Sequence, residues 1–294
     1  MTGATPLERL LRRDRWIVLG GIGAVVLLAA VYTVAGVGMD MSALTMTRMA
    51  VAMPGMAMMP AIWSPGYALA VFLMWWVMMV AMMIPSAAPA ILLFAAGARR
   101  RVVSRSPHGA TSAFVFGYLA VWGAFSAAAT ALQWGLESIG LVTGMMEIAS
   151  GPIAGTVLVA AGLYQLTPLK EACLKHCQHP LLFLLHHWRP GAIGAFRMGL
   201  EHGAFCLGCC WFLMALLFVG GIMNLIWIAG IALYVGLEKI AANRRWVTTS
   251  AGWALLLAGG FKGRKGKTFF LRPRFALGDF LLPDFMSFSG RLRR

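Results

Sequence analysis

The chain contains long apolar segments, and no other feature restricts its fold more strongly. Several of them approach or exceed the roughly 20 residues that a helix needs to cross a hydrocarbon core of about 30 Å. Of the 294 residues, 60% are hydrophobic and only 12% are charged, and the mean hydropathy is +0.77. Because backbone groups inside a bilayer must find partners within their own segment, such segments must be helices. The sequence therefore predicts an all-α integral membrane protein, a polytopic bundle of transmembrane helices.

The apolar segments predict six membrane helices, and a seventh if a short C-terminal segment also crosses. The six cover residues 16–38, 67–97, 111–136, 150–168, 195–219 and 222–240. Residues 246–260 are short for a span and precede a basic tail, so we favour an interfacial or re-entrant segment there. Four regions result: an N-terminal anchor helix at 1–38, a Met-rich outer loop at 39–66, a metal-binding helical domain at 67–245 and a C-terminal region at 246–294.

The positive charge predicts how the chain is oriented. The net charge of +15 would suggest a nucleic-acid partner in a soluble protein, but here Lys and Arg lie between apolar segments, where they mark cytoplasmic loops. Basic groups precede the first helix and follow the second, fourth and sixth. The loops at 39–66, 137–149 and 220–221 carry almost none and belong outside. We therefore expect a multi-pass protein of the bacterial inner membrane with a cytoplasmic N-terminus, no nucleic-acid partner, and the lipid bilayer around it.

Cysteine and histidine gather in one part of the sequence. All five Cys and five of the six His fall between residues 173 and 210. Two motifs contain most of them: "CLKHC" at 173–177, expected on a cytoplasmic loop, and "HGAFCLGCC" at 202–210, expected where the fifth helix begins. Such clustering favours a metal or redox site over five unrelated buried thiols.

Helical geometry places the second motif on one face. At 3.6 residues per turn, Met198, His202, Cys206, Cys209 and Cys210 occupy about a third of the helix circumference. In the first motif Cys173 and Cys177 are one turn apart, and His176 flanks them if the segment is helical. The linker between the motifs is long enough for both to contribute to one site.

The donor types indicate which metals fit. Thiolates suit Cu(I), zinc and iron–sulfur clusters, imidazole suits copper and zinc, and thioethers favour Cu(I). A disulfide framework is the least favoured alternative, because the count of cysteines is odd and the expected compartment is reducing. Copper as Cu(I) is therefore the first candidate, and zinc is the second.

Three further polar residues lie near these motifs. His186 and His187 in "LLFLLHHWRP" have the pattern of an interfacial anchor at a helix end more than that of metal ligands. Glu201 is costly within a membrane helix unless it is paired, so it is a candidate partner for His202 or Lys175, or it reaches the headgroups.

Methionines dominate the predicted outer loop. Residues 39–59 contain eight of them, including "MPGMAMM". Thioethers hold Cu(I) in an oxidising compartment where thiols would be oxidised, which makes Met53, Met56, Met58 and Met59 candidate ligands. The alternative is an amphipathic loop lying on the outer leaflet.

The second predicted helix continues this pattern inward. Met74, Met78 and Met82 follow at intervals of four residues, and Pro85 and Pro89 are expected to interrupt the helix below them. The Met ladder, our name for these three residues, offers a soft-ligand route from the outer loop to the inner cysteines. Ordinary packing is the alternative, since Met is common in membrane helices.

Small residues predict a close helix contact beside the cysteines. Gly199 and Gly203 have the small-xxx-small spacing that lets two membrane helices approach closely. They lie next to the face that carries the candidate ligands.

Four segments resemble a known bacterial family. They are "MMVAMMIPSAAPAILLF", "GYLAVWGAFSAAATALQWGLE", "YQLTPLKEACLKHCQHPL" and "GLEHGAFCLGCCWFLMALLFVGGIMNLIWIAGIALYVGLEK". Together, across roughly residues 60–245, they look like the domain of unknown function 2182 family, which is described as predicted metal-binding integral membrane proteins. The resemblance implies a helical membrane fold and metal binding through Cys173, Cys177, Cys206, Cys209 and Cys210, with His202 at a matching position.

These observations favour a membrane protein that handles Cu(I) by transfer, transport or insertion into a copper enzyme. A metallochaperone or a copper enzyme is then the expected partner. Nothing in the sequence requires catalysis, and no phosphate loop or nucleotide-binding glycine pattern is present. Two alternatives stay open: a membrane thiol-redox, haem or iron–sulfur protein, and a non-catalytic assembly subunit in which Cys and Met only pack.

Overall fold

The computed structural model describes residues 6–37, 41–52, 62–100, 107–144, 146–240 and 245–270. Within these ranges the chain forms eleven helices and no strand, apart from one isolated bridge between Val142 and Ile148. The helices are α1 (Pro6–Ala35), α2 (Ala43–Ala52), α3 (Pro65–Arg100), α4 (Pro107–Ser138), α5 (Gly151–Gln165), α6 (Pro168–Gln178), α7 (Pro180–His186), α8 (Gly191–Ala215), α9 (Leu217–Gly220), α10 (Leu225–Ile240) and α11 (Arg245–Phe270).

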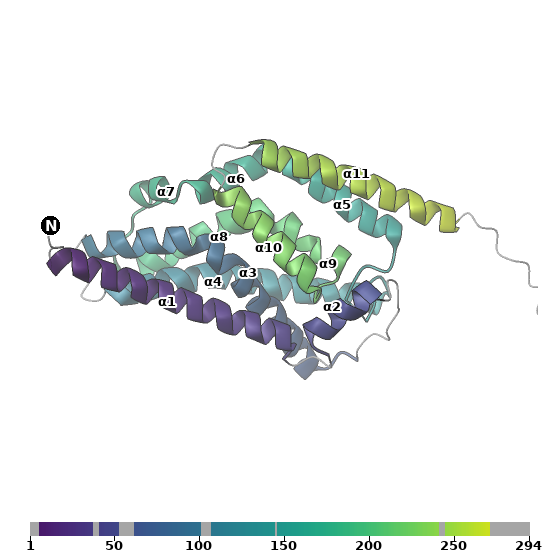
Figure 1. Cartoon of the computed structure of the whole chain (residues 1–294), viewed down its shortest axis with the longest axis horizontal. Coiled ribbons are helices and arrows are strands. Elements are labelled where there is room, and N and C mark those ends of the chain that lie inside the picture. Colours follow the sequence, from purple (N-terminus) through teal and green to yellow (C-terminus); the bar gives the residue numbers. More distant parts are fainter. Residues whose placement is uncertain are drawn as a thin grey trace, which may run out of the picture.

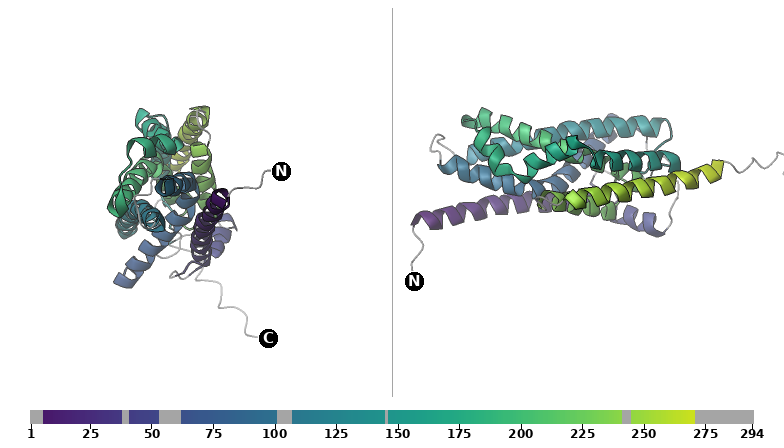
Figure 2. Two further views of the ribbon diagram at one scale, coloured as in Figure 1. Left: turned by 90° about the vertical axis from the view of Figure 1, so that its left-hand side faces the viewer. Right: turned by 90° about the horizontal axis from the view of Figure 1, so that it is seen from above.

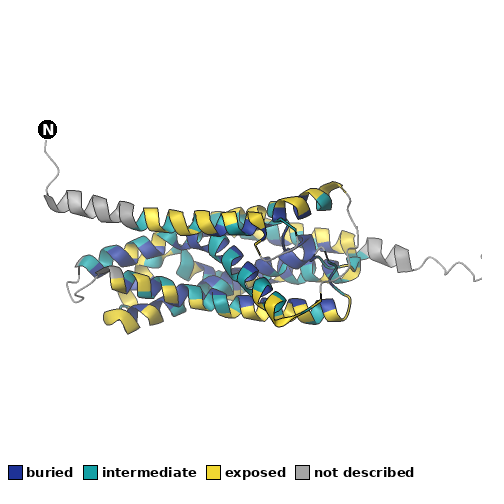
Figure 3. Ribbon diagram, turned by 90° about the horizontal axis from the view of Figure 1, so that it is seen from below, coloured by how far each residue is buried: buried dark blue, intermediate teal, exposed yellow. Residues whose placement is uncertain are grey.

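The long helices run along a common axis and form an elongated bundle (Figures 1 and 2). Helix α4 packs against both α3 and α8, and α1 packs on the other side of α3. Burial is concentrated where these helices meet, whereas α1 exposes much of its surface (Figure 3). Because the exposed surface is itself apolar, with Leu27, Leu28 and Val31 all more than half exposed, it suits contact with lipid.

Six or seven membrane helices were predicted, but fewer of the observed helices are long and apolar enough to span a membrane. Among the described residues, four qualify: Val18–Ala35, Pro65–Arg99, Gly109–Ser138 and Gly191–Gly220. The pair α5 and α6 qualifies as a fifth only if the two are taken as one broken span. Helix α10, predicted at 222–240, has 16 residues, about 24 Å at 1.5 Å per residue, which is shorter than the hydrocarbon core.

The predicted helix at 150–168 corresponds to α5, and a second helix follows it after two residues. Helix α5 ends at Gln165, and α6 begins at Pro168 after a bend of 64°. The local sequence explains the break, because a residue before proline avoids helical geometry and Thr167 caps α6 by accepting a hydrogen bond from the Lys170 amide. The "CLKHC" motif therefore lies on a helix, not on the expected loop.

Helix α3 corrects a second expectation. It runs without a break from Pro65 to Arg100, and Pro85 and Pro89 lie inside it. A proline inside a membrane helix removes a backbone hydrogen bond, and neighbouring helices and nearby side chains can satisfy the groups left without one. The Met ladder and the residues below it thus belong to one continuous element.

The predicted outer loop also contains ordered structure. Residues 43–52 form α2, with Met46 buried, and the Thr47 hydroxyl accepts a 2.9 Å hydrogen bond from the amide of Leu225, the first residue of α10. This contact attaches α2 to the start of α10.

Residues 246–260, expected as an interfacial or re-entrant segment, lie within α11. This helix packs along α5 (Figure 1). Gly155 and Gly162 of α5 face Gly259 and Gly252 of α11, and a Cβ at any of the four positions would come within 2.9 Å of an atom of the other helix. Each helix therefore has two glycines seven residues apart, and these glycines allow the two helices to pack closely.

Candidate metal centre

The two cysteine motifs come together because α6 packs against α8. Cys173 of α6 lies directly over Gly208 of α8, where a Cβ would be 2.8 Å from the Cys173 sulfur. The Cys177 thiol interacts with those of Cys206 and Cys209. The "HGAFCLGCC" motif is in the second half of α8, since Cys206 is 15 residues, or about 22 Å, beyond the first residue of that helix. It does not mark a helix start, as the sequence had suggested.

Cys206 is the centre of this thiol cluster, a name we use for the five cysteines of α6 and α8. Its backbone carbonyl accepts hydrogen bonds of 3.0 Å from the thiols of both Cys209 and Cys210. Its own sulfur interacts with the thiols of Cys177, Cys209 and Cys210. All three cysteines of α8 are buried, those of α6 are half-buried, and all five are free thiols.

The thiol cluster is not arranged as a finished metal site. In the part of the chain that the structure describes, no three His, Cys, Asp or Glu side chains are grouped so that they could hold a metal ion. The thiols of Cys209 and Cys210 both donate hydrogen bonds to the Cys206 carbonyl. Metal binding would require these two side chains to turn from the carbonyl toward a shared point.

His202 lies one turn before Cys206 on α8 and is only 3% exposed. The rings of Phe114, Tyr118 and Phe183 surround it, with centroids 5.7–6.1 Å away. Its Nδ1 is buried and has no hydrogen-bond partner among the described residues. A buried polar atom without a partner costs free energy, and a ring nitrogen of this kind is available to a metal. The donor set of the thiol cluster and His202 therefore fits a soft metal ion.

A buried lysine contacts the thiol cluster, and the sequence reasoning had missed it. The Lys239 ammonium donates to the Cys206 sulfur at 3.0 Å and to the Ser86 hydroxyl at 2.7 Å, and the residue is 8% exposed. The Tyr118 hydroxyl lies 3.1 Å from the same sulfur. Lys239 had been treated as a topology charge after the sixth helix. The sequence did contain an indication that Lys239 is special, because Glu238 and Lys239 interrupt an otherwise apolar segment.

A buried ion pair supports this arrangement from the other side of α10. The ammonium of Lys170, which is fully buried on α6, donates to both carboxylate oxygens of Glu238 at 2.8 Å. Gln165 and Tyr234 also donate to that carboxylate. Because α6 carries Cys173 and Cys177, while α10 carries Lys239, this pair fixes the positions of two helices that contribute to the thiol cluster. Removing one partner of such a pair leaves an unpaired buried charge.

The remaining histidines make local contacts. His176 stacks on Phe205 of α8 with ring centroids 4.0 Å apart, and its Nδ1 lies 3.0 Å from the Ala172 carbonyl. His186 and His187 similarly place Nδ1 near the backbone carbonyl four residues earlier. His179 is the residue between α6 and α7. Beside its contact with Ala172, His176 keeps one ring nitrogen for another partner.

Glu201 has a different partner from those expected. Its carboxylate forms a 2.8 Å ion pair with Arg189, not with His202 or Lys175. Lys175 pairs instead with Glu171 on its own helix. This pair joins Arg189, which precedes α8, to a residue within that helix, while the second carboxylate oxygen of Glu201 is buried and has no partner among the described residues.

The Met ladder is buried inside the bundle. Met74, Met78 and Met82 are each at most 3% exposed, and the neighbouring Met79 and Met83 are completely buried. At its lower end the Tyr118 hydroxyl donates to the Met83 carbonyl at 3.3 Å while contacting Cys206. The lower end of the ladder thus adjoins the thiol cluster. Met53, Met56, Met58 and Met59 lie outside the described residues.

The chain matches a family of known description. The family model of the PpoB2 copper chaperones matches residues 72–261, a range that includes the Met ladder, the whole thiol cluster and Lys239. The match does not confirm the name of the domain of unknown function 2182 family, but it agrees with the expectation of copper. No curated protein and no solved structure matches this chain. Since the match covers more than half of the sequence, the chain belongs to the PpoB2 copper chaperone family.

Proposed function

We propose that this protein is a membrane copper chaperone that holds Cu(I) at the thiol cluster and delivers it to a copper protein. The observation that carries the proposal is the convergence of Cys177, Cys209 and Cys210 on Cys206, beside a buried His202 nitrogen without a partner. Thiolate and imidazole donors suit Cu(I). Membership of a copper chaperone family supports copper over zinc as the cargo.

The membrane location is part of the proposal. Four helices, or five with the broken pair, are long and apolar enough to cross a bilayer. Basic residues gather in the sequence between these helices, as in Arg99 to Arg101 around the end of α3, Lys175 in α6 and Arg189 between α7 and α8. This pattern supports a bacterial inner membrane protein with a cytoplasmic N-terminus. Helices α6 and α7 and the start of α8 would then lie toward the reducing side.

We propose that Cu(I) travels along the Met ladder. Thioethers bind Cu(I) without a charge, so neighbouring sulfurs of similar affinity permit stepwise movement. Met74, Met78 and Met82 are buried on α3, and the next residue, Met83, contacts Tyr118, which in turn contacts Cys206. Met53, Met56, Met58 and Met59 would capture the ion before it enters the ladder.

Copper content of the purified protein tests the central proposal. In detergent and under anaerobic conditions, the wild type is expected to bind Cu(I) stoichiometrically in competition with a chromophoric chelator. Replacing Cys206, Cys209 and Cys210 together by alanine should abolish this binding, because it removes the donors on α8. Elemental analysis of both proteins for copper and zinc gives the metal identity.

A matched control accompanies the triple variant. Trp211→Phe changes an exposed side chain on the same turn of α8 and should keep the wild-type copper content. If the wild type binds neither copper nor zinc, the proposal is wrong. If it binds neither metal but forms a disulfide reversibly among these cysteines, the thiol-redox alternative replaces it.

Lys239 should set the affinity for Cu(I). A Cu(I) ion bound by two or three thiolates carries net negative charge, which is costly in a buried site without a counter-cation. Lys239→Met removes the ammonium at similar length and should weaken Cu(I) binding about tenfold, or ~1.4 kcal/mol. Lys239→Arg keeps the charge and should bind more tightly than Lys239→Met. Equal affinities for the two variants would show that the charge is not what matters.

A further inference from the structure

A buried carboxylate lies at the end of the bundle opposite the N-terminus. Glu137, the second-last residue of α4, is 7% exposed. One carboxylate oxygen accepts a 2.7 Å hydrogen bond from the Trp63 indole, and the other accepts a 2.8 Å bond from the Gln133 amide. Both donors are neutral. Glu137 is therefore held firmly in place by groups that do not neutralise its charge.

No cation balances this carboxylate within the described ranges. The ion pairs found there join Lys170 to Glu238, Glu171 to Lys175 and Arg245, and Arg189 to Glu201, and none includes Glu137. Its position at the C-terminal end of α4 adds the negative end of the helix dipole. An unpaired acid inside a membrane bundle is costly, and such residues commonly mark an ion pathway. A cation that binds reversibly at this position would balance the charge of the Glu137 carboxylate.

Hydrogen bonds connect Glu137 to two tryptophans that are close to methionines in the sequence. Its donor Trp63 follows the Met-rich stretch by four residues in the sequence. On the other side, the Gln133 carbonyl oxygen accepts a 2.8 Å hydrogen bond from Trp75, which is adjacent to Met74 at the top of the Met ladder. Glu137 is thereby linked, through Gln133, to the residue that follows the first methionine of the Met ladder.

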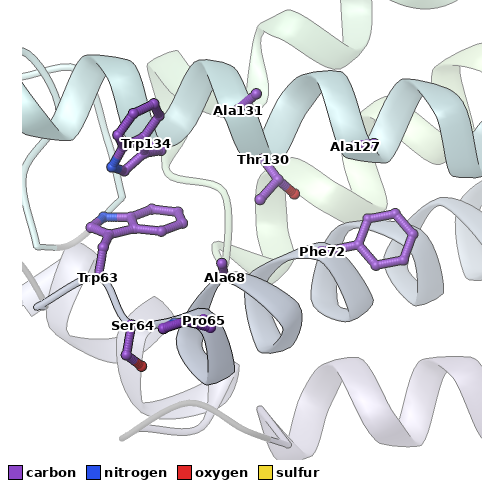
Figure 4. A pocket seen from close by; sticks show the side chains of 9 residues that line it. All are labelled: Trp63, Ser64, Pro65, Ala68, Phe72, Ala127, Thr130, Ala131 and Trp134. Carbon is purple, nitrogen blue, oxygen red and sulfur yellow. The ribbon is translucent and has the colours of Figure 1, made fainter.

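A cavity of about 410 Å³ opens beside this network between α3 and α4. Trp63 and Trp134 lie close together at one end of it, and Phe72 lies at the other (Figure 4). Its lining is almost wholly apolar, apart from Ser64 and Thr130. Indole faces attract a desolvated cation, and Trp is the best of the aromatic side chains in this respect. The cavity therefore gives access to the side chain of Trp63, which donates to Glu137, although Glu137 itself does not line it.

We propose that Glu137 and Trp63 form an outer cation site that receives a soft monovalent ion before it reaches the Met ladder. Carboxylate charge and the indole face attract the ion, and the thioethers of the ladder then accept it. This inference rests on the proposed function, since it takes Cu(I) as the ion. It adds a binding site of a different chemistry, at the end of the Met ladder that is remote from the thiol cluster.

Tryptophan fluorescence with Ag(I), a redox-stable substitute for Cu(I), tests the outer cation site. The background is the Cys206/Cys209/Cys210→Ala variant, so the inner donors of α8 do not contribute. Ag(I) should quench its fluorescence, and Trp63→Phe in the same background should lose a defined part of this quenching. An unchanged quenching amplitude after Trp63→Phe would overturn the proposal.

The charge requirement is tested in the same background with two matched variants. Glu137→Gln should weaken the Trp63-dependent quenching at least tenfold in Ag(I) concentration. Glu147→Gln removes one negative charge from the neighbouring loop, outside the hydrogen-bond network, and should leave the quenching unchanged. Equal titration curves for the two variants would show that Glu137 only supports the fold, and the proposal would then be rejected.

The test also covers a background variant that does not fold, and it separates this inference from the proposed function. If the triple cysteine background does not fold, the intact chain is first loaded with stoichiometric Ag(I), and further Ag(I) is then titrated with and without Trp63→Phe. The proposed function is judged separately, by the copper content of the wild type and the triple variant. Loss of the outer cation site with intact copper binding rejects this inference alone, whereas absent copper binding rejects the proposed function.

Discussion

Cys206→Ala alone should weaken Cu(I) binding about a hundredfold, or roughly 2.7 kcal/mol. Its sulfur interacts with three other thiols and contacts Lys239 and Tyr118. Cys173 is placed differently, because it lies over Gly208 and its only thiol neighbour of note is Cys209. Cys173→Ala should therefore cost no more than about threefold in affinity. The difference follows from position, since both changes remove one sulfur.

Anaerobic competition with a chromophoric Cu(I) chelator measures both affinities on one scale. A thermal unfolding curve of each apo protein serves as control, because the alanine variants must be equally folded for the comparison to hold. The contrary result would be equal losses for Cys173→Ala and Cys206→Ala. All cysteines would then contribute alike, and Cys206 would not be the centre of the site.

The sequence was sufficient to find the residues of the thiol cluster but not the lysine that contacts it. Periodicity places Cys206, Cys209 and Cys210 on one face of a helix whichever residue begins that helix. The contact with α6 depends on the bend after Gln165, which a hydropathy pattern does not reveal. Lys239 was missed because basic residues near helix ends usually lie in loops, and burial overrode that rule here.

The predicted count of six or seven spans is not confirmed, for a related reason. Helices α5 and α10 are apolar, but with 15 and 16 residues each is too short to qualify as a span by itself. Hydropathy measures how apolar a segment is and does not distinguish lipid from protein as its neighbour. The same limit applies to the Met ladder. Its spacing was visible in the sequence, whereas its burial follows from the positions of α3 and α4.

Gly199→Ala should prevent the protein from folding stably, with a loss of more than about 4 kcal/mol. Helices α4 and α8 touch through their backbones: a Cβ at Gly199 would lie 2.0 Å from the Phe114 carbonyl oxygen, and one at Gly117 would lie 2.1 Å from that of Phe196. Backbone atoms in two packed helices cannot move aside as a side chain can. Relief of the overlap requires the helices to separate, which opens a closely packed contact of the bundle.

Gly135→Ala is the matched control for this prediction, because Gly135 lies on α4 and a Cβ added there would have no atom of another residue within 4 Å. This variant should be neutral or slightly stabilising. The yield of monodisperse protein and its thermal unfolding in detergent compare the two variants. Separation of α4 from α8 would also withdraw Tyr118 from Cys206, so any Gly199→Ala protein that does fold should bind Cu(I) more weakly. Wild-type stability and affinity for Gly199→Ala would mean that the two helices are not in backbone contact.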